Sequence, residues 1–283
     1  MGKEILERAK KRKNDEFYTL QKDVDSYLGS YSYQFFGGKT VLCNCNDGEN
    51  SAFVKFFKRN FFQLRLHKLI YITFGPDAKI MVFDGHNVSA TMLTEGGGCF
   101  TAEVLAVAST CDVIVTNPPF SLFNKFMQVY HLLGKHLILI GPLSAIGYRD
   151  IFPLLNFRKL FVDGYVKEFV TPDGEVKKFG NIVWWSTVRE KFRDDRKIDK
   201  GVLFDAEKYP KYENYDGYDC DKISNLPVDF NGVMGVPLTF MLKWNPRQYR
   251  IVGFRKGYDG KDLRYFKGGD VHYPYSRILI QKI

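Results

Sequence analysis

Residues 111–120 read CDVIVTNPPF, and this stretch decides the fold. Its first six residues form a short, mostly apolar run, which is typical of a strand buried on both faces. Asn117, Pro118, Pro119 and Phe120 follow this strand directly. Ligands in doubly wound α/β folds bind just beyond the carboxyl ends of the strands, so the sequence predicts a functional site at this tetrad.

Apolar runs on both sides of this stretch predict the other strands. They cover residues 39–45, 68–74, 79–83, 136–140, 159–162 and 181–187. Helical spacing of apolar residues predicts helices between them, over residues 21–28, 51–62, 101–109 and 121–134. This alternation indicates an α/β fold with a Rossmann-like, mostly parallel sheet flanked by helices.

Three segments refine this prediction. Only four residues separate 68–74 from 79–83. A parallel crossover needs about a dozen or more, so we expect an antiparallel hairpin there. Residues 85–98 are rich in glycine and threonine, and we expect a loop. Residues 3–13 are predicted to form a basic helix.

The sequence pattern changes near residue 190. Charged residues, tyrosine, aspartate and glycine dominate through residue 224, and no long helix is predicted after that. We therefore expect a catalytic domain over residues 1–190 and a loop-rich C-terminal region over residues 191–283.

Composition narrows the class of protein. The 283 residues carry a net charge of +9 and five cysteines. The basic excess favours phosphate-rich partners. The cysteines are odd in number and lack zinc-ligand spacing, so we expect reduced thiols, mostly in the core, and no metal site. No apolar run is long enough to span a membrane and the first residues lack a secretory signal, so we expect a cytoplasmic protein.

The tetrad is suited to methylation of an exocyclic amino group such as that of adenine. That nitrogen is a poor nucleophile because its lone pair is delocalised into the ring. The side-chain oxygen of Asn117 and the carbonyl of Pro118 can accept its two hydrogens and draw the lone pair out of conjugation. Pro118 and Pro119 fix φ and remove backbone donors, and Phe120 can stack on the base. Catalysis then rests on positioning and oriented dipoles.

A second site is indicated in the turn after strand 39–45. Asn46, Asp47 and Ser51 lie where nucleotide-like cofactors bind in such folds. Asp47 can pair with the ammonium of S-adenosylmethionine (AdoMet), and N–H groups of the next helix can meet its carboxylate. The usual glycine-rich fingerprint is absent, and an ordinary helix N-cap also explains this turn. For the bare NPP tripeptide, the alternative is a proline-rich turn followed by a core phenylalanine.

These pieces together resemble the EcoRI-type family of adenine-specific DNA methyltransferases. The NPPFSLF stretch and MGVPLTF at residues 234–240 are much more specific than NPP alone. Further matching stretches are KNDEFYT at 13–19, CNCNDGENSAFVKFF at 43–57, DVIVTNPPFSLF at 112–123, FGNIVWW at 179–185 and YSRILI at 275–280. The resemblance implies an AdoMet-dependent enzyme that methylates adenine at a specific sequence in double-stranded DNA, with base flipping.

The resemblance also implies residue roles. Asn117 to Phe120 would be the catalytic loop. Asn14, Phe17 and Thr19 would line the AdoMet pocket, and Gly98 to Phe100 would lie near the cofactor's adenine. Two departures bear on cofactor binding. The family usually shows Asp-Pro where this chain has Asp47-Gly48, and it tends to have an acidic residue where Cys99 stands.

DNA contacts are expected mainly in residues 191–283, whose basic, aromatic and loop-rich character suits target recognition and fold completion. The arginine and lysine residues assigned to DNA are Arg193, Arg196, Lys197, Arg247, Arg250 and Arg255. We expect a monomer, with a cognate restriction endonuclease as a further partner.

Two other functions fit parts of this pattern. One is methylation of an RNA base or of a protein glutamine, because NPP-type loops are shared by such enzymes. The other is a catalytically inactive homologue that binds nucleic acid, which the Gly48 and Cys99 departures motivate. The basic charge and the family-wide motifs favour DNA methylation.

Overall fold

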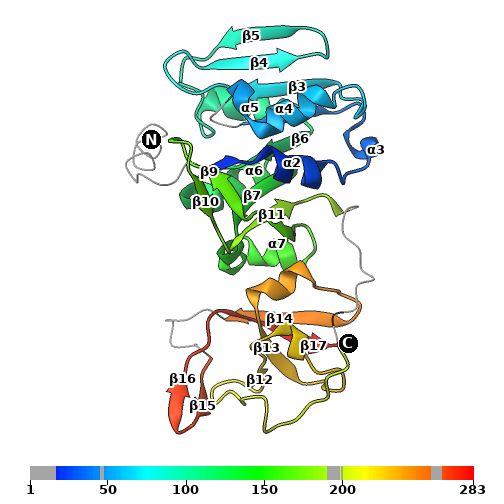
Figure 1. Cartoon of the computed structure of the whole chain (residues 1–283), viewed down its shortest axis with the longest axis vertical. Coiled ribbons are helices and arrows are strands. Elements are labelled where there is room, and N and C mark those ends of the chain that lie inside the picture. Colours follow the sequence, from blue (N-terminus) through cyan, green and yellow to red (C-terminus); the bar gives the residue numbers. More distant parts are fainter. Residues whose placement is uncertain (1–16, 45–47, 190–197, 199, 256–262) are drawn as a thin grey trace. The chain divides into compact units, whose positions relative to one another are not determined.

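The computed structural model describes residues 17–44, 48–189, 198, 200–255 and 263–283 (Figure 1). The predicted basic helix at residues 3–13 lies outside the described residues. The chain divides into two compact units. The first comprises Met1–Pro142 and Gly164–Val188, and the second comprises Leu143–Asp163 and Arg189–Ile283.

The largest sheet has eight strands in the order β5-β4-β3-β2-β6-β7-β11-β8. Its first seven strands lie in the first unit, and β8 is divided between the two units. The four strands β3, β2, β6 and β7 are parallel neighbours, whereas β4, β5 and β11 pair antiparallel with theirs. The strands are β2 (Thr40–Cys43), β3 (Lys68–Ile72), β4 (Lys79–Phe83), β5 (Val88–Met92), β6 (Val113–Thr116), β7 (His136–Pro142), β8 (Phe161–Tyr165) and β11 (Ile182–Ser186).

The centre of this sheet is buried on both faces. All four residues of β2 and of β6 are buried, and so are the five residues of β11. Continuous apolar strands of this kind need helices on both faces. The helices are α2 (Gln21–Leu28), α3 (Tyr33–Phe36), α4 (Ala52–Arg59), α5 (Ala102–Thr110), α6 (Phe123–His131) and, in the second unit, α7 (Phe152–Asn156).

Two adjacent tryptophans in β11 identify the helices that cover each face. Trp184 stacks on Tyr27 of α2 at 4.0 Å and meets Phe53 of α4 edge-on at 6.1 Å. Trp185 packs instead against Phe123 of α6 at 5.4 Å. Since successive side chains of a strand point to opposite faces, α2 and α4 cover one face and α6 covers the other.

Most of the predicted elements are confirmed. Helix α2 spans the predicted residues, and β3 and β4 form the predicted antiparallel hairpin. One prediction is wrong: residues 85–98 are not all loop, because β5 pairs with β4 along Val88–Met92. All five residues of β5 are exposed, and the strand has only the short alternation Val88, Ala90, Met92 in place of the continuous apolar run that marks the buried strands.

A small three-stranded sheet joins segments that are far apart in the sequence. Its order is β1 (Tyr18–Thr19), β9 (Glu168–Val170), β10 (Val176–Lys178). Both pairings are antiparallel. This sheet fixes the backbone around Phe17 and Thr19, two residues predicted to line the cofactor site.

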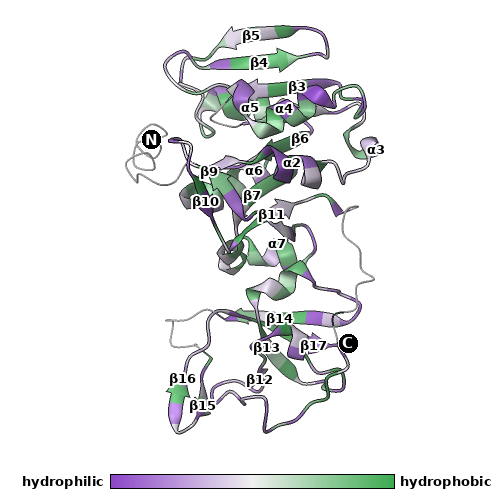
Figure 2. Cartoon of the chain, viewed as in Figure 1, coloured by the Kyte–Doolittle hydropathy of each residue, from purple (hydrophilic) through white to green (hydrophobic). Residues whose placement is uncertain are grey.

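The second unit contains a four-stranded sheet of order β12-β13-β17-β14 and a separate two-stranded ribbon, β15-β16. The predicted motifs MGVPLTF and YSRILI supply β13 and β17, which pair antiparallel. Hydropathy along these strands is shown in Figure 2. The strands are β12 (Tyr218–Asp219), β13 (Val233–Pro237), β14 (Tyr249–Arg255), β15 (Tyr265–Lys267), β16 (Asp270–His272) and β17 (Arg277–Lys282).

A buried ion pair joins β12 to β17 in this unit. Arg277 donates to both carboxylate oxygens of Asp219, over 2.9 and 3.2 Å. Tyr212 donates a third hydrogen bond to the same carboxylate at 2.5 Å. Among the residues with described structure, no helix is both long and apolar enough to cross a bilayer.

Candidate functional site

The site lies where the chain reverses its direction of travel across the sheet. From β2 the chain moves to β3 on one side, and from β6 it moves to β7 on the other. The carboxyl ends of the adjacent strands β2 and β6 therefore flank a topological switch point, which is where open α/β sheets bind ligands. Thr116, the last residue of β6, donates a hydrogen bond to the Asn44 carbonyl after β2 at 2.6 Å.

The Asn117 side chain is held in one orientation at this point. Its nitrogen Nδ2 donates to the backbone carbonyl of Phe17 at 2.7 Å and to Thr19 Oγ1 at 3.3 Å. Because a carbonyl only accepts, the amide cannot be flipped, and Oδ1 must face the other way. Oδ1 is buried and has no hydrogen-bond partner among the described residues. Buried acceptors are normally satisfied, so this oxygen has hydrogen-bonding capacity that the described residues leave unfilled.

The backbone of the proline pair leaves one carbonyl for a ligand. Pro119 has φ −51° and ψ 130°, and its carbonyl accepts a hydrogen bond from the Leu122 N–H at 2.9 Å. That bond belongs to the single helical turn Phe120–Leu122, which precedes α6. The Pro118 carbonyl, one residue closer to Asn117, is thus the better candidate for the second acceptor.

Phe120 belongs to an aromatic cluster at the small three-stranded sheet. Its ring stacks on Phe17 with centroids 5.7 Å apart and an interplanar angle of 22°. Phe169 and Phe179 meet Phe120 edge-on at 5.9 and 6.2 Å. Phe120 is half-buried, so one side of its ring is covered by protein while part remains accessible.

A hydrogen-bonded chain ties the segment after β2 to the predicted adenine-binding loop. Asn44 Nδ2 donates to the Tyr130 hydroxyl at 3.0 Å, and that hydroxyl donates to the Cys99 carbonyl at 2.6 Å. Burial raises the pKa of Tyr130, which keeps its proton in place for this bond. Phe126 supports the ring by stacking on Tyr130 at 3.9 Å.

Cys99 supplies no charge to this loop. Burial raises the pKa of its thiol to about 12, so the group is neutral at physiological pH. An acidic residue at this position would carry a negative charge that the thiol lacks. Cys43, Cys111 and Cys220 are buried, as predicted, and Cys45 lies outside the described residues.

Two glycines with positive φ, Gly48 and Gly97, lie in loops that pack against Thr73, just after β3. Gly48 has φ +50°, which proline cannot adopt because its ring fixes φ near −65°. The backbone at Gly48 therefore has a conformation that the proline usual at this position in the family cannot adopt. Gly97 has φ +75°, and a Cβ there would lie 2.2 Å from the Thr73 carbonyl oxygen, so only glycine lets this loop pack on the end of β3.

Other predicted contacts have structural roles in this arrangement. The Ser51 hydroxyl accepts from the Phe53 N–H at 3.3 Å and so caps α4, as the N-cap interpretation expects. The Gly98 carbonyl accepts from Thr101 Oγ1 at 2.9 Å, and Phe100 lies under the Lys125 ammonium at 4.5 Å. Asn14, Asn46 and Asp47 lie outside the described residues.

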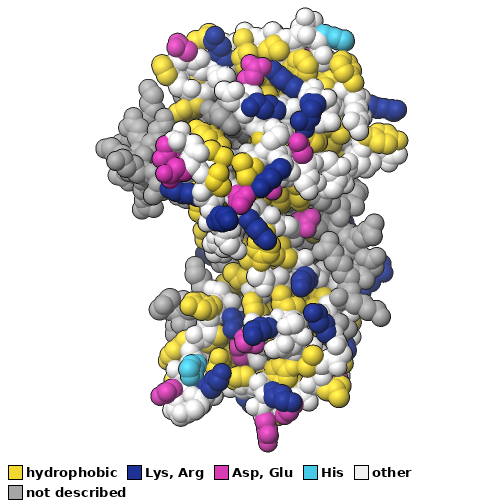
Figure 3. Space-filling view, viewed as in Figure 1, with side chains coloured by type: hydrophobic (Ala, Val, Ile, Leu, Met, Phe, Trp, Pro, Cys, Tyr) yellow, Lys and Arg dark blue, Asp and Glu magenta, His cyan; other side chains and the backbone are white. Residues whose placement is uncertain are grey.

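Of the six basic residues predicted to contact DNA, three lie within the described residues and three lie outside them. Arg193, Arg196 and Lys197 lie outside the described residues. Arg250 is exposed and donates to Gln281, and the Arg255 guanidinium lies 5.7 Å from the centre of the Tyr215 ring. Arg247 is exposed. Figure 3 shows Lys and Arg scattered over the visible face rather than gathered in one patch, so the charges on this face do not mark a site for nucleic acid.

Sequence reasoning missed several residues of this site. Tyr130 and Phe169 belong to no recognisable motif, whereas Asn44 and Phe179 lie in the matching stretches CNCNDGENSAFVKFF and FGNIVWW without an assigned role. Asn44 directly follows a predicted strand, and that position was the available signal for it. The contact of Tyr130 with the Cys99 carbonyl joins residues 31 positions apart and is visible only in three dimensions.

Comparisons with known proteins cover nearly the whole chain. The family model described as adenine-specific methyltransferase EcoRI matches residues 5–91 and 76–277. The type II methyltransferase M.MgeORF184P of Mycoplasma genitalium is 36% identical over 269 residues, covering 87% of this chain and 84% of that protein. M.EcoRI of Escherichia coli, also a type II methyltransferase, is 33% identical over 320 residues, covering 98% and 96%. No solved structure matches the chain.

Proposed function

The chain belongs to the EcoRI family of adenine-specific methyltransferases, and we propose that its NPPF tetrad binds the target adenine and drives the methyl transfer. Membership makes the chain a type II DNA methyltransferase that modifies adenine at a specific sequence. The residues that perform the reaction, the cofactor site and the way in which DNA is held are the proposed parts.

The observation that carries the proposal is the buried, unpartnered Oδ1 of Asn117. Leaving such an oxygen unpaired costs about 1–3 kcal/mol, a cost that a bound amino group removes. Its counterpart Nδ2 is already committed to Phe17 and Thr19. The side chain is thus an acceptor fixed before substrate arrives, which is how preorganised electrostatic catalysis operates.

Two acceptors activate the adenine nitrogen in this proposal. Asn117 Oδ1 accepts one amino hydrogen and the Pro118 carbonyl accepts the other. Together they pull the hydrogens toward the protein and return lone-pair density to the nitrogen. The stabilisation grows as the nitrogen becomes tetrahedral, so it acts mainly on the transition state. The nitrogen is cationic once it is methylated, and it then loses one hydrogen as a proton to solvent, so no strong base is required.

Phe120 holds the plane of the base. An adenine inside a duplex is out of reach of a buried site, so the target nucleotide must be extruded. The half-buried ring offers a stacking surface that Phe17, Phe169 and Phe179 support from behind. A fluorescent 2-aminopurine at the target position should therefore brighten when protein and cofactor are added. Unchanged fluorescence at saturating protein and cofactor would overturn base flipping.

The residues around the switch point fit AdoMet as the methyl donor of a Rossmann-like fold. When bound, AdoMet supplies an electrophilic methyl group. Phe17 provides an apolar wall, and Gly98 and Phe100 form the loop tied to the end of β2 through Tyr130. Asn14, Thr19, Asn46, Asp47 and Ser51 complete the proposed set, with Asp47 as the partner of the cofactor's ammonium.

Calorimetry separates this function from an inactive homologue. The departures at Gly48 and Cys99 favour weakened cofactor binding, because Gly48 changes the backbone and neutral Cys99 provides no charge. We expect a measurable heat of AdoMet binding that Asp47→Ala and Phe17→Ala both reduce. Absence of binding by the natural protein would favour the inactive reading, and unchanged affinity in both variants would move the cofactor site elsewhere.

The C-terminal region 191–283 is proposed to provide most of the DNA recognition. The side chains proposed to contact DNA are Arg247, Arg250 and Arg255, which the structure describes, and Arg193, Arg196 and Lys197, which lie outside the described residues. The enzyme is proposed to act as a monomer in the cytoplasm, alongside a cognate restriction endonuclease. The alternative function of the same tetrad is methylation of an RNA base or of a protein glutamine. Incubation with AdoMet that carries a labelled methyl group, followed by identification of the labelled product, distinguishes these functions from DNA methylation.

A further inference from the structure

The ribbon β15–β16 stands apart from the other sheets of the second unit. It pairs Tyr265 with His272, Phe266 with Val271 and Lys267 with Asp270, and it pairs with no other strand among the described residues. Gly268 and Gly269 make its two-residue turn, with φ +62° and +92°. Positive φ at both positions is what a tight hairpin turn requires. Figure 1 shows the ribbon projecting from the four-stranded sheet.

The base of the ribbon is anchored to the body of its unit. Tyr265 packs against a small core formed by Tyr212, Leu263 and Leu279. His272 stacks on Tyr265 with centroids 5.9 Å apart and an interplanar angle of 16°. Isolated two-stranded hairpins are marginally stable in water, so this anchoring matters. A rigid base with a projecting tip suits an element that inserts into a partner.

The tip presents apolar groups that the protein itself does not cover. Phe266 is 57% exposed and its cross-strand neighbour Val271 is 43% exposed. Their positions in the register place both side chains on the same face of the ribbon. Tyr273 and Tyr275, which follow the ribbon, are 63% and 92% exposed. Apolar groups gathered on a projecting element mark an interaction site.

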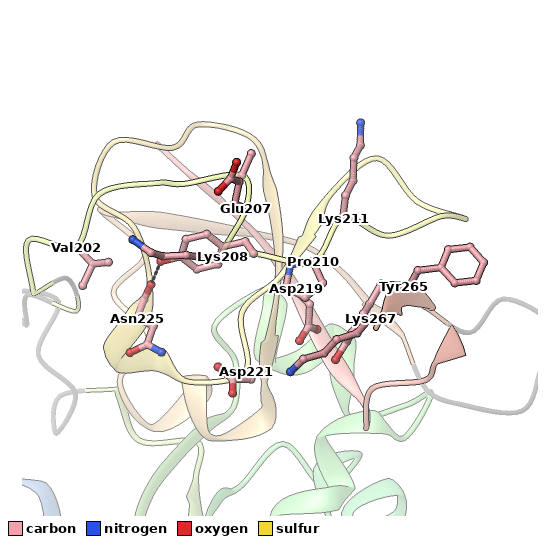
Figure 4. Close-up of a pocket in the computed structure, with 13 residues that line it drawn as sticks. Val202, Glu207, Lys208, Pro210, Lys211, Asp219, Asp221, Asn225, Tyr265 and Lys267 are labelled. Atoms are coloured by element: carbon pink, nitrogen blue, oxygen red, sulfur yellow. Dashed lines mark hydrogen bonds between the residues drawn. The ribbon is translucent and has the colours of Figure 1, made fainter. Parts of the chain in front are cut away.

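Lys267 is poorly suited to be the main contact of the ribbon. It faces Asp270 across the ribbon and, like Phe266, lines a cleft of about 630 Å³ that Asp219 and Asp221 also line (Figure 4). Carboxylates around an ammonium weaken its attraction for phosphate. The distinctive chemistry of the ribbon is therefore its apolar face.

We propose that β15–β16 enters the major groove of the substrate DNA and that Phe266 and Val271 read a thymine methyl group there. This inference rests on the DNA methylation proposed above. The major groove admits a two-stranded ribbon, and among base edges only thymine presents a methyl group in it. Apolar side chains such as phenylalanine recognise that methyl. The net charge of +9 favours DNA over a second copy of the same basic chain.

The test compares Phe266→Ala/Val271→Ala with the matched control Phe157→Ala, which removes a ring that is 72% exposed in the same unit. Genomic DNA is methylated by each protein and sequenced to define its motif. We expect the ribbon variant to lose roughly tenfold in preference at one motif position, as one lost base contact predicts. The control should keep the wild-type motif. Because neither replaced group is charged, the dependence of affinity on salt should not change.

A substituted substrate makes the test independent of folding. Replacing thymine by deoxyuridine at that position removes only the methyl group. We expect the wild-type enzyme to lose affinity for this DNA by about the same factor, and the ribbon variant to show no further loss. Equal deoxyuridine sensitivity of both proteins, or an unchanged motif in the variant, would overturn the inference.

Two further measurements separate the remaining outcomes. If the variant alters the sedimentation coefficient but not the motif, the ribbon binds a second copy and the inference is wrong. If the wild-type protein methylates no DNA, the function itself fails. The ribbon inference alone fails if methylation is normal and the motif and the deoxyuridine sensitivity do not respond to the variant.

Discussion

Asn117 Nδ2 donates a hydrogen bond to the backbone carbonyl of Phe17 at 2.7 Å, across 100 positions of sequence. This contact fixes which end of the Asn117 amide faces the site. It also couples the NPPF tetrad to the strand β1, and through the pairing of β1 with β9 to residues near 170. The orientation of the catalytic acceptor is thus a tertiary property.

Replacing Asn117 with alanine should lower turnover by at least about a hundredfold, as for other single preorganised contacts. The lost acceptor acts mainly in the transition state, so AdoMet affinity should change little. Single-turnover kinetics and calorimetry measure the two quantities. Wild-type turnover in the variant would remove Asn117 from the mechanism.

Thr19 acts through Asn117 and is a positioning residue. Thr19→Val removes the acceptor at 3.3 Å and keeps the shape of the side chain, while the Phe17 carbonyl still holds Nδ2. We expect turnover to fall by roughly threefold to tenfold, the worth of one hydrogen bond, with the KM for DNA unchanged. Thr19→Ser restores the hydroxyl and should restore turnover. Failure of that rescue, with equal stability, would show that the hydroxyl has no such role.

Tyr130 couples the loop at Cys99 to the end of β2. Tyr130→Phe leaves the Cys99 carbonyl and Asn44 Nδ2 without this partner. We expect AdoMet affinity to fall by roughly tenfold and stability to fall by about 1–3 kcal/mol. Tyr33→Phe, at a tyrosine that is 48% exposed, is the matched control and should change neither. If calorimetry gave the wild-type affinity for AdoMet in Tyr130→Phe, these hydrogen bonds would have no role in cofactor binding.

Arg247 is an exposed cation in the region assigned to DNA. If it contacts a phosphate, Arg247→Gln should flatten the slope of log affinity against log salt concentration by about 0.9. Lys68→Gln is the control, because Lys68 begins β3 at the amino end of the strands, opposite the site. Equal slopes for the two variants would place the DNA elsewhere.

The Asp219–Arg277 pair should matter for stability rather than catalysis. Both side chains are buried, so Arg277→Ala leaves a carboxylate without its cation. We expect a loss of about 3–5 kcal/mol in the free energy of unfolding. Lys211→Ala removes an exposed partner of Asp216 and should cost less than about 1 kcal/mol. Denaturant unfolding measures the free energy of unfolding of both variants. A loss in Arg277→Ala as small as that in Lys211→Ala would show that the buried pair is dispensable.

The strands at the centre of the first sheet were predictable because burial on both faces leaves a continuous apolar run. β6 and β7 carry that signal, and β5 does not, because every one of its residues is exposed. β15 and β16 are equally hidden, since their three-residue strands are mostly exposed. Edge strands and ribbons are defined by backbone pairing with a neighbouring strand, and this pairing does not require a recognisable amino-acid composition.

The same division holds for the site. The NPPF tetrad could be found because a distinctive motif follows directly on a clear strand. The resemblance implies that Phe17 and Thr19 line the cofactor pocket, and the structure adds that both accept hydrogen bonds from the Asn117 side-chain amide. Contacts between residues about a hundred positions apart follow from sheet topology, which sequence periodicity does not specify.

The most direct test of the account identifies the methylated atom. Duplex DNA is incubated with the protein and with AdoMet carrying an isotopically labelled methyl group, then digested to nucleosides and analysed by mass spectrometry. We expect label in N6-methyladenine alone, at one sequence, and no label above background with Asn117→Ala. Label in cytosine, or equal N6-methyladenine from the wild-type protein and Asn117→Ala, would contradict it.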